Sequence, residues 1–208
     1  MTGEGPLWEF ERRAWQRGAR AIAGVDEAGR GPLAGPVVAA AVILDENDPI
    51  DGLNDSKQLS EKKRERLFAE IHTRARSVGV GIVSPAEIDR INILQATLRA
   101  MTLAVESLPV GGVNADLLLI DALTLPGVPL PQEGIIGGDA KSASIAAASI
   151  IAKVTRDRMM LEFEAEYPGY GFAGHKGYPT RAHKEAIVRL GPSPIHRRTF
   201  RGVVATGG

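Results

Sequence analysis

The feature that most constrains the fold of this chain is a glycine-rich segment with two adjacent acids, placed between two apolar runs. Residues 21–25 and 36–44 are almost entirely aliphatic, which predicts two buried strands that pair as a hairpin. Residues 26–36, which join them, carry Asp26, Glu27 and Arg30 together with three glycines and two prolines. Because a solvated loop does not need so many residues with special backbone geometry, the sequence indicates a site at the end of the first strand.

The two adjacent acids impose a geometric condition. Successive side chains of a strand point to opposite faces, so Asp26 and Glu27 serve one site only where the strand ends or bulges. Gly29, Gly31 and Gly35 give the chain the freedom to do so. Paired carboxylates beside glycines and an arginine indicate a hard metal ion next to a sugar-phosphate backbone. For the two acids alone, a solvated loop would be the better interpretation.

The composition is that of one globular domain. The chain has 208 residues, 44% of them hydrophobic, and no linker divides it, so we expect a single domain over residues 1–208. The absence of cysteine excludes disulfides, zinc–thiolate sites and thiol catalysis, and fits a reducing compartment. The sequence shows neither a signal peptide nor an apolar run long enough to cross a bilayer. We expect a cytoplasmic monomer with no membrane partner.

The charges are unevenly distributed, although the formal net charge is +0. Residues 171–208 hold seven Lys/Arg and one acid, a balance of +6, so the remainder carries −6. A basic end on an acidic body is typical of a protein that grips phosphate beside a metal–carboxylate site. The alternative is a basic tail that only keeps the protein soluble. Three histidines and a Gly-Tyr-Pro group in the same stretch favour a substrate-binding segment at about residues 168–208.

The other elements follow from capping residues and hydrophobic periodicity. Residues 5–19 are amphipathic and predict an N-terminal helix within about residues 1–19, to which we assign no chemistry. Ser60 and Ser84 are N-cap candidates, the first for a helix that reaches about residue 72. Further helices are predicted to about residue 107 and over 142–166, with strands at 78–83, 117–121 and 134–138. Periodicity alone gives this order of elements only an α/β class.

Two further acids follow apolar strands. Residues 117–120 are uninterrupted leucine and isoleucine, typical of a strand covered on both faces, and Asp121 comes at its end. Asp139 lies 18 residues further on, just before the long helix. Both are therefore candidates to join the first two acids.

Four segments of the sequence together resemble the ribonuclease HII family of type 2 ribonucleases H, over about residues 20–201. They are GVDEAGRGP at 24–32, NDSKQLS at 54–60, GDAK at 138–141 with SIAAASIIAKVTRD at 144–157, and GFAGHKGYPT at 171–180. The resemblance implies a ribonuclease H-like fold, a mixed five-stranded sheet flanked by helices, with a small helical basic segment at the C-terminal end.

The resemblance also implies a reaction. It is the endonucleolytic hydrolysis of the RNA strand of RNA·DNA hybrids, and cleavage 5′ of ribonucleotides embedded in duplex DNA, leaving 3′-OH and 5′-phosphate ends. Two Mg²⁺ or Mn²⁺ ions suit this chemistry, because they activate water and neutralise charge on the attacking and leaving oxygens. The motif positions that hold metal in the family correspond to Asp26, Glu27, Asp121 and Asp139. Asp157 competes for the fourth place, but an ion pair with Lys153, Arg156 or Arg158 suits it better.

By the same resemblance, several residues recognise the substrate. Gly29, Arg30 and Gly31 are expected against the scissile ribose, where glycines let the backbone reach a 2′-OH. The Tyr178 ring is expected on the adjoining deoxyribose, the alternative being an ordinary core tyrosine. Candidate phosphate contacts are Lys57, Lys176, Arg197 and Arg198, although charged surface residues are common. We expect backbone or phosphate contacts from three histidines: His175, His183 and His196.

Two other functions stay open. Ribonuclease HIII has similar motifs, but its long N-terminal substrate-binding extension does not fit the 20 or so residues before the first strand. The other is a catalytically silent module that binds RNA·DNA hybrids. Four unpaired acids argue against it, because on a nucleic-acid-binding surface they would only repel phosphate. The C-terminal residues 201–208 lack a glutamine-plus-aromatic segment, so we do not expect tethering to a sliding clamp.

Overall fold

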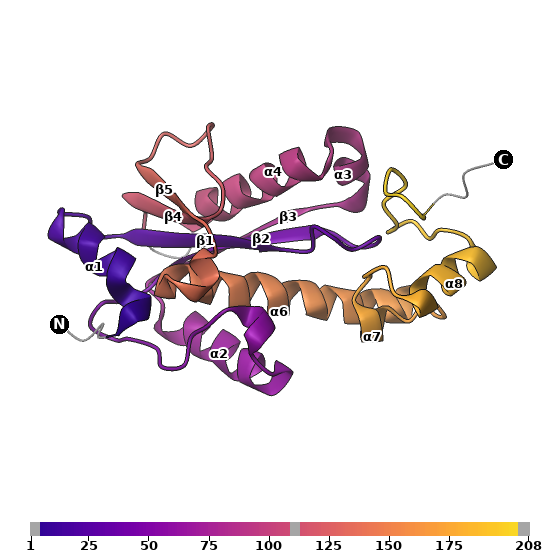
Figure 1. The fold of residues 1–208 in the computed structure, drawn as a ribbon, viewed down its shortest axis with the longest axis horizontal. Helices are drawn as coiled ribbons and strands as arrows, with labels where there is room; N and C mark the ends of the chain where they lie inside the picture. Colours follow the sequence, from indigo (N-terminus) through magenta and orange to yellow (C-terminus); the bar gives the residue numbers. More distant parts are fainter. Residues whose placement is uncertain (1–4, 109–112, 204–208) are drawn as a thin grey trace.

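The computed structural model describes residues 5–108 and 113–203, which contain one five-stranded sheet (Figure 1). Its strands are β1 (Ile22–Ala28), β2 (Val37–Ile43), β3 (Ser77–Val83), β4 (Leu117–Asp121) and β5 (Gln132–Ile135). Their order in the sheet is β3-β2-β1-β4-β5. β1, β2 and β3 pair antiparallel, whereas β4 pairs parallel with both β1 and β5. The predicted mixed sheet is confirmed.

One strand boundary matters for the site. The sequence predicts that the first strand ends before the acids, but β1 continues through Asp26 and Glu27 to Ala28. The reason is that β2 keeps pairing with this segment, as far as Ala28 opposite Val38. On the other edge, pairing with β4 stops one residue before Asp26. The acids therefore lie where β1 has a neighbour on one side only.

The fifth strand also lies earlier than predicted. It was expected over 134–138, but β5 ends at Ile135. Gly137 adopts a left-handed conformation (φ 65°) and leads into a short 3₁₀-helix, Gly138–Ala140. A glycine tolerates this conformation without a steric penalty, which ends the extended chain here.

The helices begin largely where the capping residues predict. Ser60 accepts a hydrogen bond from Lys63 N–H, and Ser84 accepts one from Glu87 N–H. The N-terminal helix is shorter than predicted, because a 3₁₀ turn over Pro6–Trp8 precedes it. The α-helices are α1 (Glu9–Gln16), α2 (Glu61–Arg74), α3 (Pro85–Ile91), α4 (Ile93–Glu106), α6 (Ala143–Glu166), α7 (Phe172–His175) and α8 (Arg181–Leu190).

The sheet separates two hydrophobic layers. α3 and α4 cover one face, and α6 with α1 and α2 covers the other (Figure 1). Alternate residues of β1 and β2 supply the two cores: Val25 and Ala41 face α4, whereas Ala40 and Val42 face α6. α7 and α8 lie beyond the end of β1, next to the turn that joins it to β2 (Figure 1).

Gly24 allows α6 to lie directly on β1. A Cβ atom at this position would lie 2.0 Å from the backbone carbon of Ser144 and 2.2 Å from Ile145 N. The many small residues at the start of α6 make the same close approach possible from the helix side. The first turn of α6 is thereby fixed against the strand that carries the acids.

The N-terminal helix is anchored by a buried acid that no sequence motif identifies. Glu11 is 1% exposed, and its Oε1 accepts hydrogen bonds from Ser142 Oγ–H at 2.6 Å and Ser144 N–H at 2.9 Å. An acid at a helix N-terminus satisfies donors that otherwise have no partner. Glu11 thus ties α1 to the start of α6.

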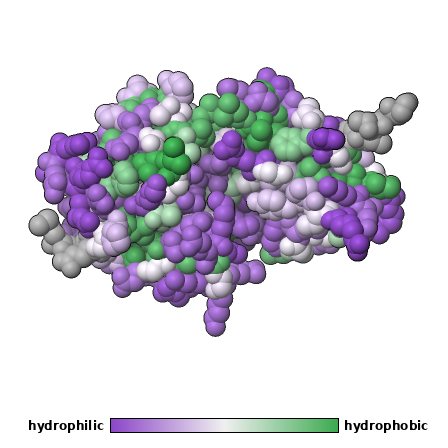
Figure 2. All heavy atoms as spheres, in the orientation of Figure 1, coloured by the Kyte–Doolittle hydropathy of each residue, from purple (hydrophilic) through white to green (hydrophobic). Residues whose placement is uncertain are grey.

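The face drawn in Figure 2 is mostly hydrophilic, with several apolar areas, one of them over α3 and α4. Leu94 and Leu103 of α4 are 44% and 36% exposed. Over the ranges described, we find no helix with the length and apolar character needed to span a bilayer.

Candidate active site

Asp26 and Asp121 are neighbours on adjacent parallel strands. The register pairs Val25 with Ile120, so the next residue of each strand is an aspartate. Because side chains alternate along a strand, Asp26 lies on the same face as Gly24, the face that α6 covers. Asp26 is 5% exposed. The two strand ends therefore bring these predicted acids together.

Asp139 is placed by its neighbour in the chain. Gly138 N–H donates to Asp121 Oδ1 at 2.7 Å, which fixes the 3₁₀-helix Gly138–Ala140 against the end of β4. Asp139 is 8% exposed and follows directly. Its Oδ2 lies 3.6 Å from Lys57 Nζ, and this ion pair brings the predicted phosphate contact Lys57 to the acids.

Glu27 joins the acids from the next position of β1. Its Oε1 lies 3.3 Å from Arg30 NH1, in a partly exposed ion pair. Burial raises the pKa of Glu27, and the Asp121 charge adds to this, although Arg30 and Lys57 act in the opposite direction. Glu27 therefore lies within the field of the other acids, despite the alternation along the strand.

The acids repel one another. Burial raises the pKa of Asp26 well above its usual range, and Glu27, Asp121 and Asp139 raise it further. Burial also raises the pKa of Asp139, and Asp55 and Asp121 add to the effect. Repulsion among four neighbouring carboxylates destabilises the folded protein, and a bound cation would offset this repulsion.

The donor set fits a hard divalent ion. Asp26 uses Oδ1 to accept from Glu27 N–H, and Asp121 uses Oδ1 to accept from Gly138 N–H, so each keeps a second oxygen. Carboxylate oxygens are the ligands that Mg²⁺ and Mn²⁺ prefer. Over residues 5–108 and 113–203, no group of three Asp, Glu, His or Cys side chains is placed closely enough to hold a metal ion as the protein stands. Binding an ion would therefore require the carboxylates of the site to move closer together.

Asp55 is an acid of this site that the sequence analysis did not select. Its Oδ1 accepts from Lys57 N–H at 2.9 Å, at the start of the 3₁₀-helix Ser56–Gln58, and its side chain lies against Asp139. Burial would lower the pKa of Lys57, but Asp139, Asp55 and the other acids raise it overall. The sequence signal for Asp55 is the segment at 54–60, which also holds Lys57.

Gly31 and Tyr178, two of the predicted recognition residues, lie side by side at the surface, whereas Gly29 is buried. A Cβ atom on Gly31 would lie 3.9 Å from Tyr178 Cε1, so the turn and the tyrosine are neighbours. Tyr178 is 42% exposed, which rules out an ordinary core tyrosine. Gly29 has a φ of 99°, and a Cβ there would lie 2.2 Å from Arg156 Nε. This glycine is therefore required both by its conformation and by the space available.

The structure corrects the prediction for Arg197. Its side chain is 0% exposed and donates only to backbone carbonyls of the 29–36 segment, so it cannot contact a phosphate. Arg198 is exposed, and its N–H donates to Asp89. Lys176 is half-buried, and its Nζ donates to Ala173 O at 2.5 Å. Both remain available to a ligand.

The histidines belong to the interior of the C-terminal segment. His183 and His196 are buried, and their Nε2 atoms lie 3.0 Å apart. His183 Nδ1–H donates to Tyr178 O at 2.9 Å, and His175 contacts Tyr170 O at 2.8 Å. The predicted backbone contacts are confirmed, and phosphate contact by the buried pair is wrong. Burial lowers the pKa of His196 to about 4, so it is neutral.

Asp157 is occupied elsewhere. It forms an ion pair with Lys153 across one helical turn, with Nζ 2.7 Å from Oδ1. This pairing is one of the three that the sequence favoured. The neighbouring Arg156 was considered only as a partner for Asp157, but it is 1% exposed and points to the 29–36 segment instead.

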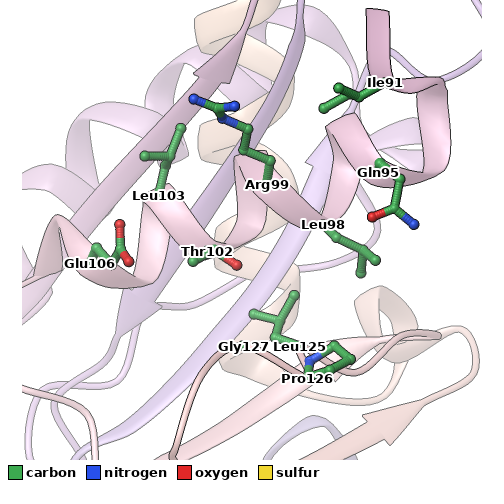
Figure 3. A pocket seen from close by; sticks show the side chains of 10 residues that line it. All are labelled: Ile91, Gln95, Leu98, Arg99, Thr102, Leu103, Glu106, Leu125, Pro126 and Gly127. Atoms are coloured by element: carbon green, nitrogen blue, oxygen red, sulfur yellow. The ribbon is translucent and has the colours of Figure 1, made fainter. Parts of the chain in front are cut away.

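A groove of about 710 Å³ lies away from these residues. It runs between α4 and the loop at 125–127, with Leu98 and Leu125 facing each other across it (Figure 3). None of the predicted site residues lines it. The acids, the glycine turn and Tyr178 are therefore the candidate site.

Replacing Asp26, the most buried acid of the site, should stabilise the protein while no metal is present. The pKa of Asp26 is higher in the folded protein than in the unfolded chain. The contribution of Asp26 to the free energy of unfolding is therefore greatest below the pKa of the unfolded state, and it is lost as the pH rises through the pKa of the folded state. We expect Asp26→Asn to raise the free energy of unfolding by about 1 kcal/mol at pH 7 in EDTA. Calorimetry from pH 5 to 8 should show a smaller loss of stability with pH than in the wild type. A variant less stable than wild type in EDTA at pH 7 would contradict the repulsion described here.

Comparison with known proteins gives the family. The family model described as Ribonuclease HII matches residues 23–203. A curated Ribonuclease HII from Geobacter metallireducens is 59% identical over 201 residues, covering 97% of this chain and 93% of the relative. The solved ribonuclease H2 of Pyrococcus horikoshii is 32% identical, with a TM-score of 0.72, covering 88% of this chain and 95% of that one.

Ribonuclease HIII is a more distant neighbour. The structure of Bst-RNase HIII in complex with Mn²⁺ is 19% identical, with a TM-score of 0.66, covering 91% of this chain and 70% of that one, and shares the fold. The identity to the Ribonuclease HII of Geobacter metallireducens is about three times higher. The chain belongs to the ribonuclease HII family and is a type 2 ribonuclease H.

Proposed function

We propose that this ribonuclease H hydrolyses the RNA strand of RNA·DNA hybrids and also cuts 5′ of ribonucleotides embedded in duplex DNA, leaving 3′-OH and 5′-phosphate ends. The observation that carries the proposal is the meeting of Asp26, Asp121 and Asp139 at one end of the sheet, beside an exposed glycine turn and Tyr178. Acids alone suit many reactions, whereas acids beside a backbone surface suited to a ribose select this one.

The acids would hold Mg²⁺ or Mn²⁺. When bound, a pair of such ions supplies an activated water and neutralises charge on the attacking and leaving oxygens. Asp26, Glu27, Asp121 and Asp139 are the residues that would hold them. The mutual repulsion of these acids and the Mn²⁺ in the ribonuclease HIII neighbour support this proposal.

Other residues of the chain orient the substrate. Arg30 is exposed on the glycine turn, and its pairing with Glu27 places a cation beside the acids. Lys57 is a second cation at the acids, paired with Asp139. Two cations that border the acids can guide a phosphate to them and offset its repulsion by the carboxylates. Arg198 and Lys176 are candidates for phosphates further from the cut.

A metal titration tests the function. We expect hybrid cleavage to require a divalent ion and to disappear in EDTA, while binding of the same hybrid persists. When the substrate is duplex DNA with one embedded ribonucleotide, mapping of the products at nucleotide resolution should place the cut on the 5′ side of that ribonucleotide. A protein that binds hybrids equally well but cleaves neither substrate with Mg²⁺ or Mn²⁺ would be the silent binding module instead.

Replacing Tyr178 tests how the enzyme senses the junction from RNA to DNA. If its exposed ring packs on the deoxyribose, Tyr178→Ala should reduce kcat/KM at a single embedded ribonucleotide roughly tenfold, which corresponds to about 1.4 kcal/mol. Cleavage of a continuous hybrid should fall less, and Tyr178→Phe, which keeps the ring, should stay near wild type. Equal losses on both substrates with a lowered Tm would show a structural role.

A further inference from the structure

Two buried arginines lie beneath the glycine turn that follows β1. Arg156, from the middle of α6, is 1% exposed, and Arg197, from the segment after α8, is 0% exposed. Arginine is almost never buried without a partner for its charge. Within the described part of the chain, neither guanidinium forms an ion pair with a carboxylate. Asp157, the acid next to Arg156, pairs with Lys153 instead.

All the side-chain hydrogen bonds of the two arginines go to backbone carbonyls. Arg197 donates four hydrogen bonds, to Gly29 O at 2.6 Å, Arg30 O at 3.0 Å, Gly35 O at 3.0 Å and Pro36 O at 3.2 Å. Arg156 donates three, to Ala34 O, Pro36 O and Lys176 O, each at 3.0 Å. Six of these seven hydrogen bonds end on the segment 29–36.

This arrangement fixes which side of the turn faces outward. In a planar trans peptide the C=O and the N–H point in opposite directions. With the carbonyls of Gly29 and Arg30 held inward, the N–H groups of Arg30 and Gly31 point away from the arginines. Both residues are exposed, and neither N–H has an acceptor among the hydrogen bonds of the described residues. Two consecutive donors are thus left for an oxygen of the substrate.

The same hydrogen bonds join the turn to the Tyr178 loop. Arg156 reaches Lys176 O from one side, and Leu33 N–H donates to Gly177 O at 2.8 Å from the other. A Cβ atom on Gly177 would lie 2.5 Å from Ala34 O, so the two segments are in direct backbone contact. The donors of the turn and the ring of Tyr178 therefore keep one fixed spacing.

We infer that Arg156 and Arg197 are positioning residues, which do not touch the substrate but aim the Arg30 and Gly31 N–H groups at its sugar-phosphate backbone and hold them in register with Tyr178. Two guanidiniums without carboxylates also leave positive charge beneath the turn, which favours a bound phosphate. Burial and the neighbouring Arg156 lower the pKa of Arg197, although the charge of Asp89 acts in the opposite direction. The inference deepens the proposed function and rests on it.

Conservative substitutions test the inference. Lysine keeps the charge but cannot reproduce the planar set of donors, so R156K and R197K should release the turn. R158K is the control on the same helix, since Arg158 is exposed and pairs with Glu65. R189K is the control in the C-terminal segment, since Arg189 is exposed and donates to Gly169 O, away from the turn.

The measurement is kcat and KM on an RNA·DNA hybrid, at a temperature where circular dichroism shows every variant folded. A misplacement of about 1 Å can reduce a rate about 10²-fold. We expect R197K to lower kcat roughly 100-fold and R156K roughly tenfold, with KM within about threefold and both controls within about twofold of wild type. A kcat equal to that of the controls overturns the inference, as does a raised KM with unchanged kcat, which would indicate direct phosphate contact.

A measurement on the wild type covers variants that fail to fold. The Nε–H groups of Arg156 and Arg197 should give slowly exchanging NMR signals, and these should shift when an RNA·DNA hybrid is added in EDTA. Signals that do not respond to the hybrid would overturn the inference. If the wild type itself cleaves no hybrid with Mg²⁺ or Mn²⁺, the proposed function fails; if it cleaves and the variants match their controls, only the positioning role fails.

Discussion

Asparagine in place of Asp121 should reduce hybrid cleavage by roughly a thousandfold while sparing hybrid binding. The substitution removes one negative charge from the acids, and losing several kcal/mol of transition-state stabilisation corresponds to a rate loss of this size. The fold should persist, because an asparagine oxygen can still accept the hydrogen bond from Gly138 N–H. Single-turnover cleavage and equilibrium binding in EDTA measure the two effects separately.

Asp157→Asn is the matched control for this prediction. It removes an acid of the same type that pairs with Lys153 on α6, so we expect a small loss of stability and nearly normal turnover. Nearly normal cleavage by Asp121→Asn would remove Asp121 from the site. If Asp157→Asn lost as much activity as Asp139→Asn, the fourth metal ligand would have to be reassigned.

Gly24→Ala should cause the largest loss of stability. Its new methyl group would lie 2.0 Å from Ser144 C and 2.3 Å from Ser144 O, and backbone atoms cannot move aside as a flexible side chain does. β1 and α6 must separate, which should cost about 3 kcal/mol, at the upper end of the usual overpacking cost. Urea unfolding measures it. Gly127→Ala, where nothing lies within 4 Å of the added Cβ, should unfold like the wild type; equal midpoints for both variants would contradict the close packing.

Local sequence signals were sufficient to predict the strands and the acids of the site. Uninterrupted aliphatic runs identify strands buried on both faces, and Asp121 could be placed at a strand end for that reason. The extension of β1 through Asp26 and Glu27 could not be predicted, because it depends on β2 pairing as far as Val38. Four motifs in family order then linked the acids to one reaction, which no single motif could do.

The arginines show what the sequence could not reveal. Arg197 stands beside Arg198 and looks like part of a basic surface, yet one is buried and the other exposed. Its partners are carbonyls more than 160 residues earlier in the chain, and a carbonyl leaves no trace in a sequence because every residue has one. Burial of this kind follows only from the folded chain.

α6 connects the two parts of the site as one rigid rod. Its N-cap, Ser142, follows Asp139 closely, and Arg156 lies 14 residues further along. At 1.5 Å per residue this separation is about 21 Å, set by helix geometry alone. Inserting one residue between them would rotate Arg156 by about 100° and turn its guanidinium away from the glycine turn. The length of α6 therefore sets the spacing between the 3₁₀-helix that carries Asp139 and the arginine that holds the glycine turn, and insertions within α6 should be tolerated far less than point substitutions on its exposed side.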